Sequence, residues 1–238
     1  MSKKHGSTPI HKTNSSGHDT VRKRAQVDVK DKNGSTPLHK AASNGHERVV
    51  EFLLEQRAQL DVVDDNGSTP LHNAAVGGYQ NVVRLLLHNG AQCDVMNVNG
   101  ETPLHKAASE GYENVVQLLV QYNAQLDIAA INGSTPLYEA ASYGHDNVVK
   151  ILLQNGAQID VEDNNGSTPL YEAASRGRDN VVKILLQNGA QINAKNMSGS
   201  TPLRVAASGG RDTVVQLLFL NGAQMNVAGD LSPCKLSK

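Results

Sequence analysis

Apolar and small residues recur along this chain in two helical patterns. After Pro37, the residues Leu38, Ala41 and Ala42 fall at i, i+3 and i+4, which predicts one face of a short helix. A second helix is predicted directly after it, with an apolar side made of Val49, Val50, Phe52, Leu53 and Leu54. Alanines on the first helix permit a close approach, so the two helices are expected to pack against each other.

Turn and capping residues bound both helices. Asn33-Gly34 is a turn signal, because glycine adopts positive φ without strain, and Thr36 can cap a helix whose first residue is Pro37. Gly45 is expected to end the first helix. In four later repeats the second helix is expected to stop at an Asn-Gly pair, which begins at Asn89, Asn155, Asn188 and Asn221.

The whole pattern repeats with a fixed period. Thr-Pro-Leu recurs every 33 residues, with its proline at Pro37, Pro70, Pro103, Pro136, Pro169 and Pro202. Such a period predicts a stacked array in which each unit contacts its neighbours, rather than one central core.

The repeated unit resembles the ankyrin repeat, over about residues 31 to 228. The match rests on Thr-Pro-Leu-His at three repeats, the Ala-Ala pairs, the Gly turn, Val-Val-x-x-Leu-Leu and the closing Asn-Gly-Ala. Departures are Tyr138, Tyr171 and Arg204 in place of the family His, and Arg57 and Asn123 in place of the helix-ending Gly. Asn tolerates the left-handed conformation, whereas Arg is expected to cost about 1 kcal/mol there.

The resemblance implies an all-α solenoid of stacked helix-turn-helix units with β-hairpin-like turns. It also implies that partners bind the concave surface formed by the hairpin tips and the first helices. In the family, the His of Thr-Pro-Leu-His hydrogen-bonds backbone between repeats.

Three segments are expected along the chain. Residues 1–29 form a degenerate, shortened repeat, because Pro9 precedes Pro37 by 28 residues and the second helix has collapsed to Val21-Arg22. Residues 30–228 hold six ankyrin repeats, and residues 229–238 form a polar tail. The last repeat keeps an apolar second helix that no later repeat covers, which suggests a fragment of a longer chain, self-association through this uncapped repeat, or a partner docked end-on.

Composition excludes several classes of protein. The net charge is −1, so a broad attraction to nucleic acid or to an anionic membrane is not expected. No apolar run is long enough for a membrane span or an N-terminal leader. Two unpaired cysteines are expected, Cys234 in the tail and Cys93 as a small buried apolar residue. These features favour the cytoplasm, with the nucleus as the alternative.

No catalytic, cofactor-binding or metal site is predicted. His39, His72 and His105 share one position, but packed repeats lie about 10 Å apart, too far for a shared metal whose nitrogen ligands lie at about 2.0 Å. Glu139 and Glu172 also share a position, yet no nucleophile or phosphate-binding loop accompanies them. An enzyme is therefore not expected.

Positions that vary between repeats are candidates for recognition. Two consecutive hairpin tips are unusually apolar, and the residue after the family His changes from Lys40 and Lys106 to Glu139 and Glu172, which predicts a groove that is basic at one end and acidic toward the other. Tyr143 is the expected hot spot. The predicted protein-binding residues are Val76, Met96, Val98, Ala130, Ile131, Glu139, Tyr143, Glu172, Arg176 and Met197. Neutral drift at exposed positions is the alternative.

The sequence therefore predicts a non-catalytic adaptor or scaffold that binds another protein or peptide. The alternatives are a stoichiometric inhibitor of a partner protein, or a fragment of a larger ankyrin-repeat channel, toxin or effector.

Overall fold

The computed structural model describes residues 27–225. In this range the chain forms twelve helices and no strand, as the repeat pattern predicts. Residues 1–26 and 226–238 lie outside the described part, and with them most of the predicted shortened repeat, the predicted tail and Cys234. The helices are α2 (Pro37–Ser43), α3 (Glu47–Glu55), α4 (Pro70–Val76), α5 (Gln80–His88), α6 (Pro103–Glu110), α7 (Glu113–Gln121), α8 (Pro136–Tyr143), α9 (Asp146–Gln154), α10 (Pro169–Arg176), α11 (Asp179–Gln187), α12 (Pro202–Ser208) and α13 (Asp212–Leu220).

The chain divides into two compact units. Unit 1 comprises Met1–Gln92 and contains α2 to α5, and unit 2 comprises Cys93–Lys238 and contains α6 to α13. Each unit is a stack of helix pairs, two in unit 1 and four in unit 2.

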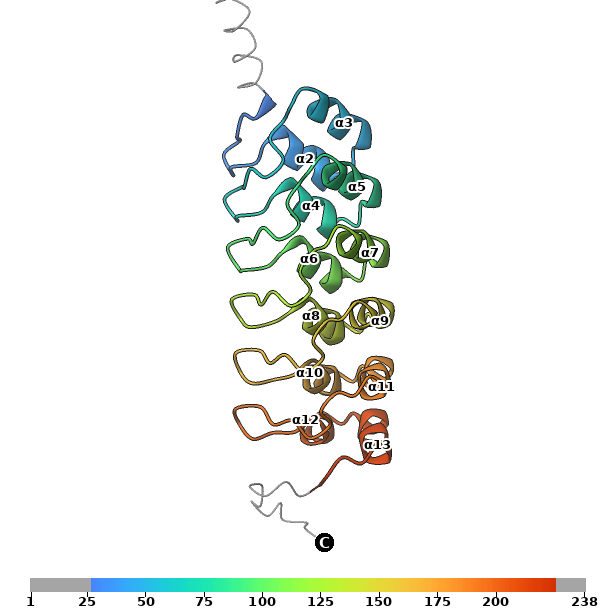
Figure 1. Ribbon diagram of the computed structural model, residues 1–238. Helices are drawn as coiled ribbons and strands as arrows, with labels where there is room; N and C mark the ends of the chain where they lie inside the picture. The colour runs from blue at the N-terminus through green and yellow to red at the C-terminus, as the bar shows by residue number, and fades with distance from the viewer. Residues whose placement is uncertain (1–26, 226–238) are drawn as a thin grey trace, which may run out of the picture. The chain divides into compact units, whose positions relative to one another are not determined.

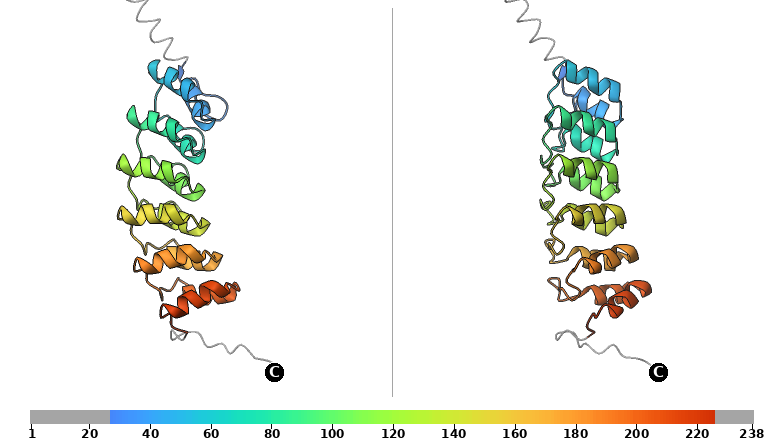
Figure 2. Two further views of the ribbon diagram at one scale, coloured as in Figure 1. Left: turned by 90° about the vertical axis from the view of Figure 1, so that its right-hand side faces the viewer. Right: turned by 45° about the vertical axis from the view of Figure 1, so that its right-hand side comes forward.

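In unit 2 the first helices of successive repeats pack on one another. Helices α6, α8, α10 and α12 form one row, each contacting the next, and α7, α9, α11 and α13 form a second row (Figures 1 and 2). Leu104, Leu137 and Leu170 are fully buried in the first row, and alanine pairs follow them on each helix. Small side chains let adjacent helices approach closely, and the leucines supply the apolar burial that holds the stack together.

Each first helix begins at the predicted threonine cap. In α6, the backbone N–H of Thr102 donates to Nδ1 of His105 at 3.1 Å, and the Thr102 hydroxyl accepts from the His105 backbone N–H. Nε2 of His105 then donates to the carbonyl of Ser134 in the following repeat, at 3.2 Å. His39 makes the same bond to Ser68 in unit 1, at 2.9 Å. The expected role of this histidine in joining repeats is confirmed at these two positions.

Side chains from the turn between the helices also join repeats. In unit 2, Nε2 of His145 donates to the Ser109 carbonyl at 2.8 Å, and Nε of Arg178 donates to the Ser142 carbonyl at 3.0 Å. The two side chains also cover Gly111 and Gly144 of the preceding repeats, where a Cβ atom would clash with them. His145 and Arg178, which occupy equivalent positions, therefore make the same structural contact with different side chains.

Two second helices end without glycine. Arg57 has φ of 64° and Asn123 has φ of 61°, in the left-handed region that sister repeats fill with glycines such as Gly90. Both residues therefore adopt the left-handed backbone conformation expected from the sequence. This conformation costs more free energy at Arg57, because asparagine tolerates this region better.

Some predicted core positions are exposed. On α3, Val50 and Leu53 are buried, but Val49 and Phe52 are exposed, and α3 packs against α2 and α5 within unit 1. Sister positions on helices that pack against second helices on both sides are buried, as at Val148 on α9 and Val181 on α11 in unit 2. Cys93 also differs from expectation, because it is half-buried and its thiol donates to the Tyr122 carbonyl at 3.6 Å.

Candidate functional site

The hairpin tips of unit 2 form a hydrogen-bonded ladder. The backbone N–H of Ile131 donates to the Asn99 carbonyl, and that of Met197 donates to the Asn165 carbonyl, both at 2.8 Å. Between them, the N–H of Asn164 donates to the Asn132 carbonyl at 2.9 Å. Successive tips are therefore held at a fixed spacing by their backbones.

Four apolar residues occupy two adjacent tips. Val98 and Ile131 are equivalent residues of consecutive repeats and are 58% and 70% exposed. Met96 and Ala129, two positions earlier in each tip, are also exposed. We call Met96, Val98, Ala129 and Ile131 the tip patch. Met197 is exposed too, but on the last tip of unit 2, with the polar tip of Asn164 between it and Ile131.

Ala130 does not belong to this exposed surface. Its side chain is buried, at 8% exposed, so the prediction that Ala130 contacts a partner is wrong. At the equivalent position of other tips, an Asp or Asn side chain accepts backbone N–H groups, as Asp163 does from Asn165 and Ser167. In the Ala130 tip, Asn132 Oδ1 accepts from the Ser134 N–H instead, at 3.0 Å, and so stabilises the turn from another position.

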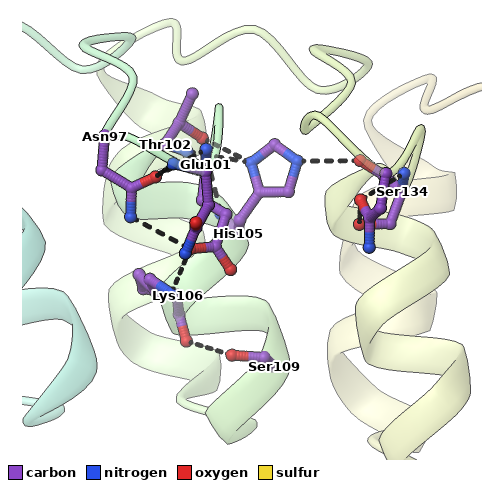
Figure 3. A network of polar contacts seen from close by, with 9 residues as sticks. Asn97, Glu101, Thr102, His105, Lys106, Ser109 and Ser134 are labelled. Carbon is purple, nitrogen blue, oxygen red and sulfur yellow. Dashed lines mark hydrogen bonds and ion pairs between the residues drawn. The ribbon is translucent and has the colours of Figure 1, made fainter. Parts of the chain in front are cut away.

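The predicted basic end of the groove is neutralised. In unit 1, Lys40 Nζ lies 3.1 Å from Asp31 Oδ2 in the tip of the same repeat. In unit 2, Lys106 forms an ion pair with Glu101, which stands where five sister repeats have serine (Figure 3). Burial raises the pKa of Glu101, but bonds from Lys106 and Asn97 outweigh this and hold it below its ordinary value. The simple gradient from basic to acidic is therefore wrong, because local carboxylates pair both lysines.

At the acidic end, three predicted residues come together on α8 and α10. Arg176 Nε donates to Glu172 Oε1 at 2.5 Å, and the Arg176 guanidinium lies 5.7 Å from the ring centroid of Tyr143. The bond to Glu172 raises the pKa of Arg176. The Tyr143 ring is exposed and also stacks on His145, with the ring centroids 6.3 Å apart.

Glu139 lies on the same helix face as Tyr143, four residues earlier, and is half-buried. Among the described residues, neither Glu139 nor the exposed Glu110 of α6 has an ion-pair partner. Glu110 was not predicted from the sequence, although it shares the repeat position of Tyr143 and Arg176. We call Glu110, Glu139, Tyr143, Glu172 and Arg176 the acidic face.

Tyr138 replaces the family histidine, and the sequence predicted no binding role for it. Its hydroxyl donates to Oδ2 of Asp163 in the next tip, at 3.1 Å. Burial raises the pKa of Tyr138, and the nearby carboxylates of Glu172, Asp163 and Glu139 raise it further. Three carboxylates therefore lie close to one hydroxyl, where the sister repeat at His105 has a histidine.

Val76 is exposed at the end of α4, in unit 1, and is the one predicted site residue outside unit 2.

The structure offers neither a metal site nor a membrane span among the described residues. Over residues 27–225, no group of three His, Cys, Asp or Glu side chains has the geometry to hold a metal. In the same range, no helix is both long enough and apolar enough to cross a membrane.

Comparisons with known proteins agree with this geometry. A family model described as ankyrin repeats in three copies matches residues 2–97, 89–163 and 157–228, so the first match includes the shortened repeat. No curated protein matches this chain. The crystal structure of the human ASB11 ankyrin repeat domain is similar, with a TM-score of 0.75 and 33% sequence identity, over 81% of this chain and 86% of that one. Ankyrin repeats generally mediate protein–protein interaction, and this chain belongs to the ankyrin-repeat family.

Proposed function

We propose that this protein is a non-catalytic adaptor or scaffold that binds another protein or peptide through unit 2. The observation that supports the proposal most is the pairing of Val98 with Ile131 on adjacent tips, both exposed. The same position holds Lys32 and Asp65 in unit 1, so the turn itself does not need an apolar residue. Contiguous exposed apolar side chains are typical of interaction sites.

The backbone ladder of the tips supports a preformed binding surface. Adjacent tips of unit 2 are joined by backbone hydrogen bonds, such as the bond from Ile131 N–H to the Asn99 carbonyl. Binding then costs little entropy for ordering the loops, which leaves more of the contact energy as affinity. Tyr143 adds an exposed aromatic side chain of the kind enriched at interface hot spots.

Affinity capture with tip-patch variants tests this proposal. The protein and its Val98→Ser/Ile131→Ser variant are each used as bait, and bound proteins are quantified by mass spectrometry. We expect a specific set of proteins to bind the natural protein and to be lost with the variant, because the apolar tip contact is removed.

Phe52→Ser is the matched control, because Phe52 is also an exposed apolar residue but lies on α3 in unit 1, outside the tips. It should retain the set of bound proteins. Equal capture by natural protein and tip-patch variant, with thermal unfolding unchanged, would show that unit 2 does not bind through its tips.

Self-association through the last repeat is a separate proposal. Leu220 is 85% exposed, and the equivalent residues of the other five repeats are all polar. Sedimentation equilibrium of the natural protein and Leu220→Gln tests it, since glutamine restores the residue found in three sister repeats. We expect the natural protein to show the larger mass, and a monomer for both would exclude self-association.

A further inference from the structure

The charges of the helix faces in unit 2 indicate what kind of partner the tips receive. At α6, the positive charge of Lys106 is paired with the carboxylate of Glu101. At α8, Glu139 has no ion-pair partner among the described residues, and neither has the exposed Glu110 of α6. The surface beside the tip patch therefore carries negative charge that the protein does not neutralise.

The position of Glu139 lies next to the hairpin tip in a sister repeat. Its equivalent in unit 1, Lys40, reaches the side chain of Asp31 in the tip of the same repeat, at 3.1 Å. Ala130 stands at the position of Asp31 in the Glu139 repeat, and its neighbours Ala129 and Ile131 belong to the tip patch. A ligand that spans the tip patch and α8 would therefore meet the Glu139 carboxylate.

The next repeat already contains a bound cation of its own. The Arg176 guanidinium forms an ion pair with the Glu172 carboxylate and lies over the Tyr143 ring. A carboxylate beside an aromatic face is a favourable environment for a guanidinium, through a charge-assisted hydrogen bond and a cation–π contact. Glu139 and Tyr143 on α8 have the same i, i+4 spacing as Glu172 and Arg176 on α10, so a half-buried carboxylate without an ion-pair partner among the described residues and an exposed ring lie together on α8 as well.

We propose that the partner is a basic peptide segment of another protein, with an arginine or lysine on Glu139 and Tyr143 and a neighbouring aliphatic residue on the tip patch. This inference rests on the proposed function and specifies its ligand. The uncompensated carboxylates attract a cation and repel the phosphates of nucleic acids and anionic membranes. The aliphatic tips select for an apolar side chain next to the cation.

A random peptide library displayed on phage identifies the preferred chemistry. Phage are selected on the natural protein, and clones that still bind Val98→Ser/Ile131→Ser are discarded. We expect the remaining clones to be enriched in arginine or lysine next to leucine, isoleucine or valine. A lack of any clone that depends on Val98 and Ile131 would count against the proposed function itself, whereas tip-dependent clones without cations would overturn only the present inference.

Variants of the acidic face then measure the contribution of charge. Binding of a selected, fluorescently labelled peptide is followed by anisotropy, and Glu139→Gln should weaken it about three- to tenfold. Glu51→Gln, an exposed carboxylate on α3 in unit 1, is the matched control and should leave the affinity unchanged. An equal loss in both variants would show that overall charge, rather than Glu139, governs binding.

Arg176→Gln should change the affinity for the peptide in the opposite direction from Glu139→Gln. Removal of this internal cation releases Glu172 and Tyr143, so the affinity for the basic peptide should rise about three- to tenfold. Lys150→Gln on α9 removes one positive charge elsewhere in unit 2 and should have a much smaller effect. Unchanged or weaker binding by Arg176→Gln would contradict the proposed cation site.

Discussion

Lys40 and Asp31 form a 3.1 Å ion pair between the first helix of a repeat and its own hairpin tip. The equivalent positions three repeats later hold Glu139 and Ala130. An aspartate at position 130 would place two carboxylates together where the earlier repeat has an ion pair. The following repeat does hold both carboxylates, Asp163 and Glu172, and there Arg176 pairs with Glu172, whereas Glu139 has no ion-pair partner among the described residues.

The first prediction concerns this pair of positions. Ala130→Asp and Glu139→Lys together should recreate the pair of Asp31 and Lys40, so their combined effect on the free energy of unfolding should exceed the sum of the single effects by about 0.5–1 kcal/mol. Urea unfolding of both single variants and the double variant measures this coupling. Strictly additive effects would show that the two positions do not interact.

The left-handed backbone at Arg57 leads to the second prediction. Arg57→Gly should raise the free energy of unfolding by about 1 kcal/mol, because glycine adopts a φ of 64° without a steric penalty. Asn123→Gly is the matched variant, with φ of 61°, and should give a smaller gain since asparagine already tolerates this region. The explanation fails if Arg57→Gly is less stable than the natural protein.

The third prediction concerns pH. Burial lowers the pKa of His105 below its ordinary value of 6.5, and of His39 likewise, so folding favours the neutral imidazoles. The unfolded chain then binds more protons below pH 6.5, and the stability contributed by neutral histidine is present above that pH and lost as the pH falls. Urea unfolding at about pH 7.5 and about pH 5.5 should show this loss.

His105→Gln is the variant for this experiment, since glutamine does not titrate and can still donate a hydrogen bond to the Ser134 carbonyl that His105 contacts. We expect a smaller fall in stability between the two pH values for this variant than for the natural protein. An identical fall would assign the pH dependence to other groups.

A fourth prediction concerns the bonds between the linkers that follow successive second helices. Asp127 Oδ1 accepts from the Gln158 backbone N–H at 2.9 Å, and Asn193 does the same for Gln224 at 3.0 Å. Asp127→Ala should lower the free energy of unfolding by about 1 kcal/mol, because it leaves the Gln158 N–H without this acceptor.

Asp127→Asn should cost less, because the chain already uses asparagine for the same bond at Asn193. Thermal or urea unfolding of the two variants compares them directly. If alanine and asparagine were equally destabilising, charge rather than the hydrogen bond would account for the role of Asp127.

Local rules explain why much of this fold follows from the sequence. The threonine cap, the proline at the first helical position and the glycine turn act within a few residues, so Thr102 and Pro103 suffice to place the start of α6. The demand for positive φ at Arg57 and Asn123 also follows from their repeat position alone. The family resemblance supplied the bond between His105 and the next repeat, which the structure contains.

Side-chain pairing was decided by the tertiary structure. The sequence placed Lys106, Glu139 and Arg176 on one predicted groove, but which carboxylate each cation contacts depends on rotamers and on neighbouring repeats. Lys106 turns to Glu101 and Arg176 to Glu172, so the predicted basic end is neutral and the negative charge near Glu139 remains.

The sequence pattern also did not predict which side chains of a hairpin tip are buried. Ala130 and Ile131 are adjacent in one tip, yet the first is buried and the second is exposed, because the turn directs successive side chains to different sides. The period, the caps and the helices follow from the amino-acid sequence alone, since these depend on local backbone preferences. Which of the variable residues face solvent and which charges remain unpaired became clear from the folded chain, because both depend on contacts between segments far apart in the sequence.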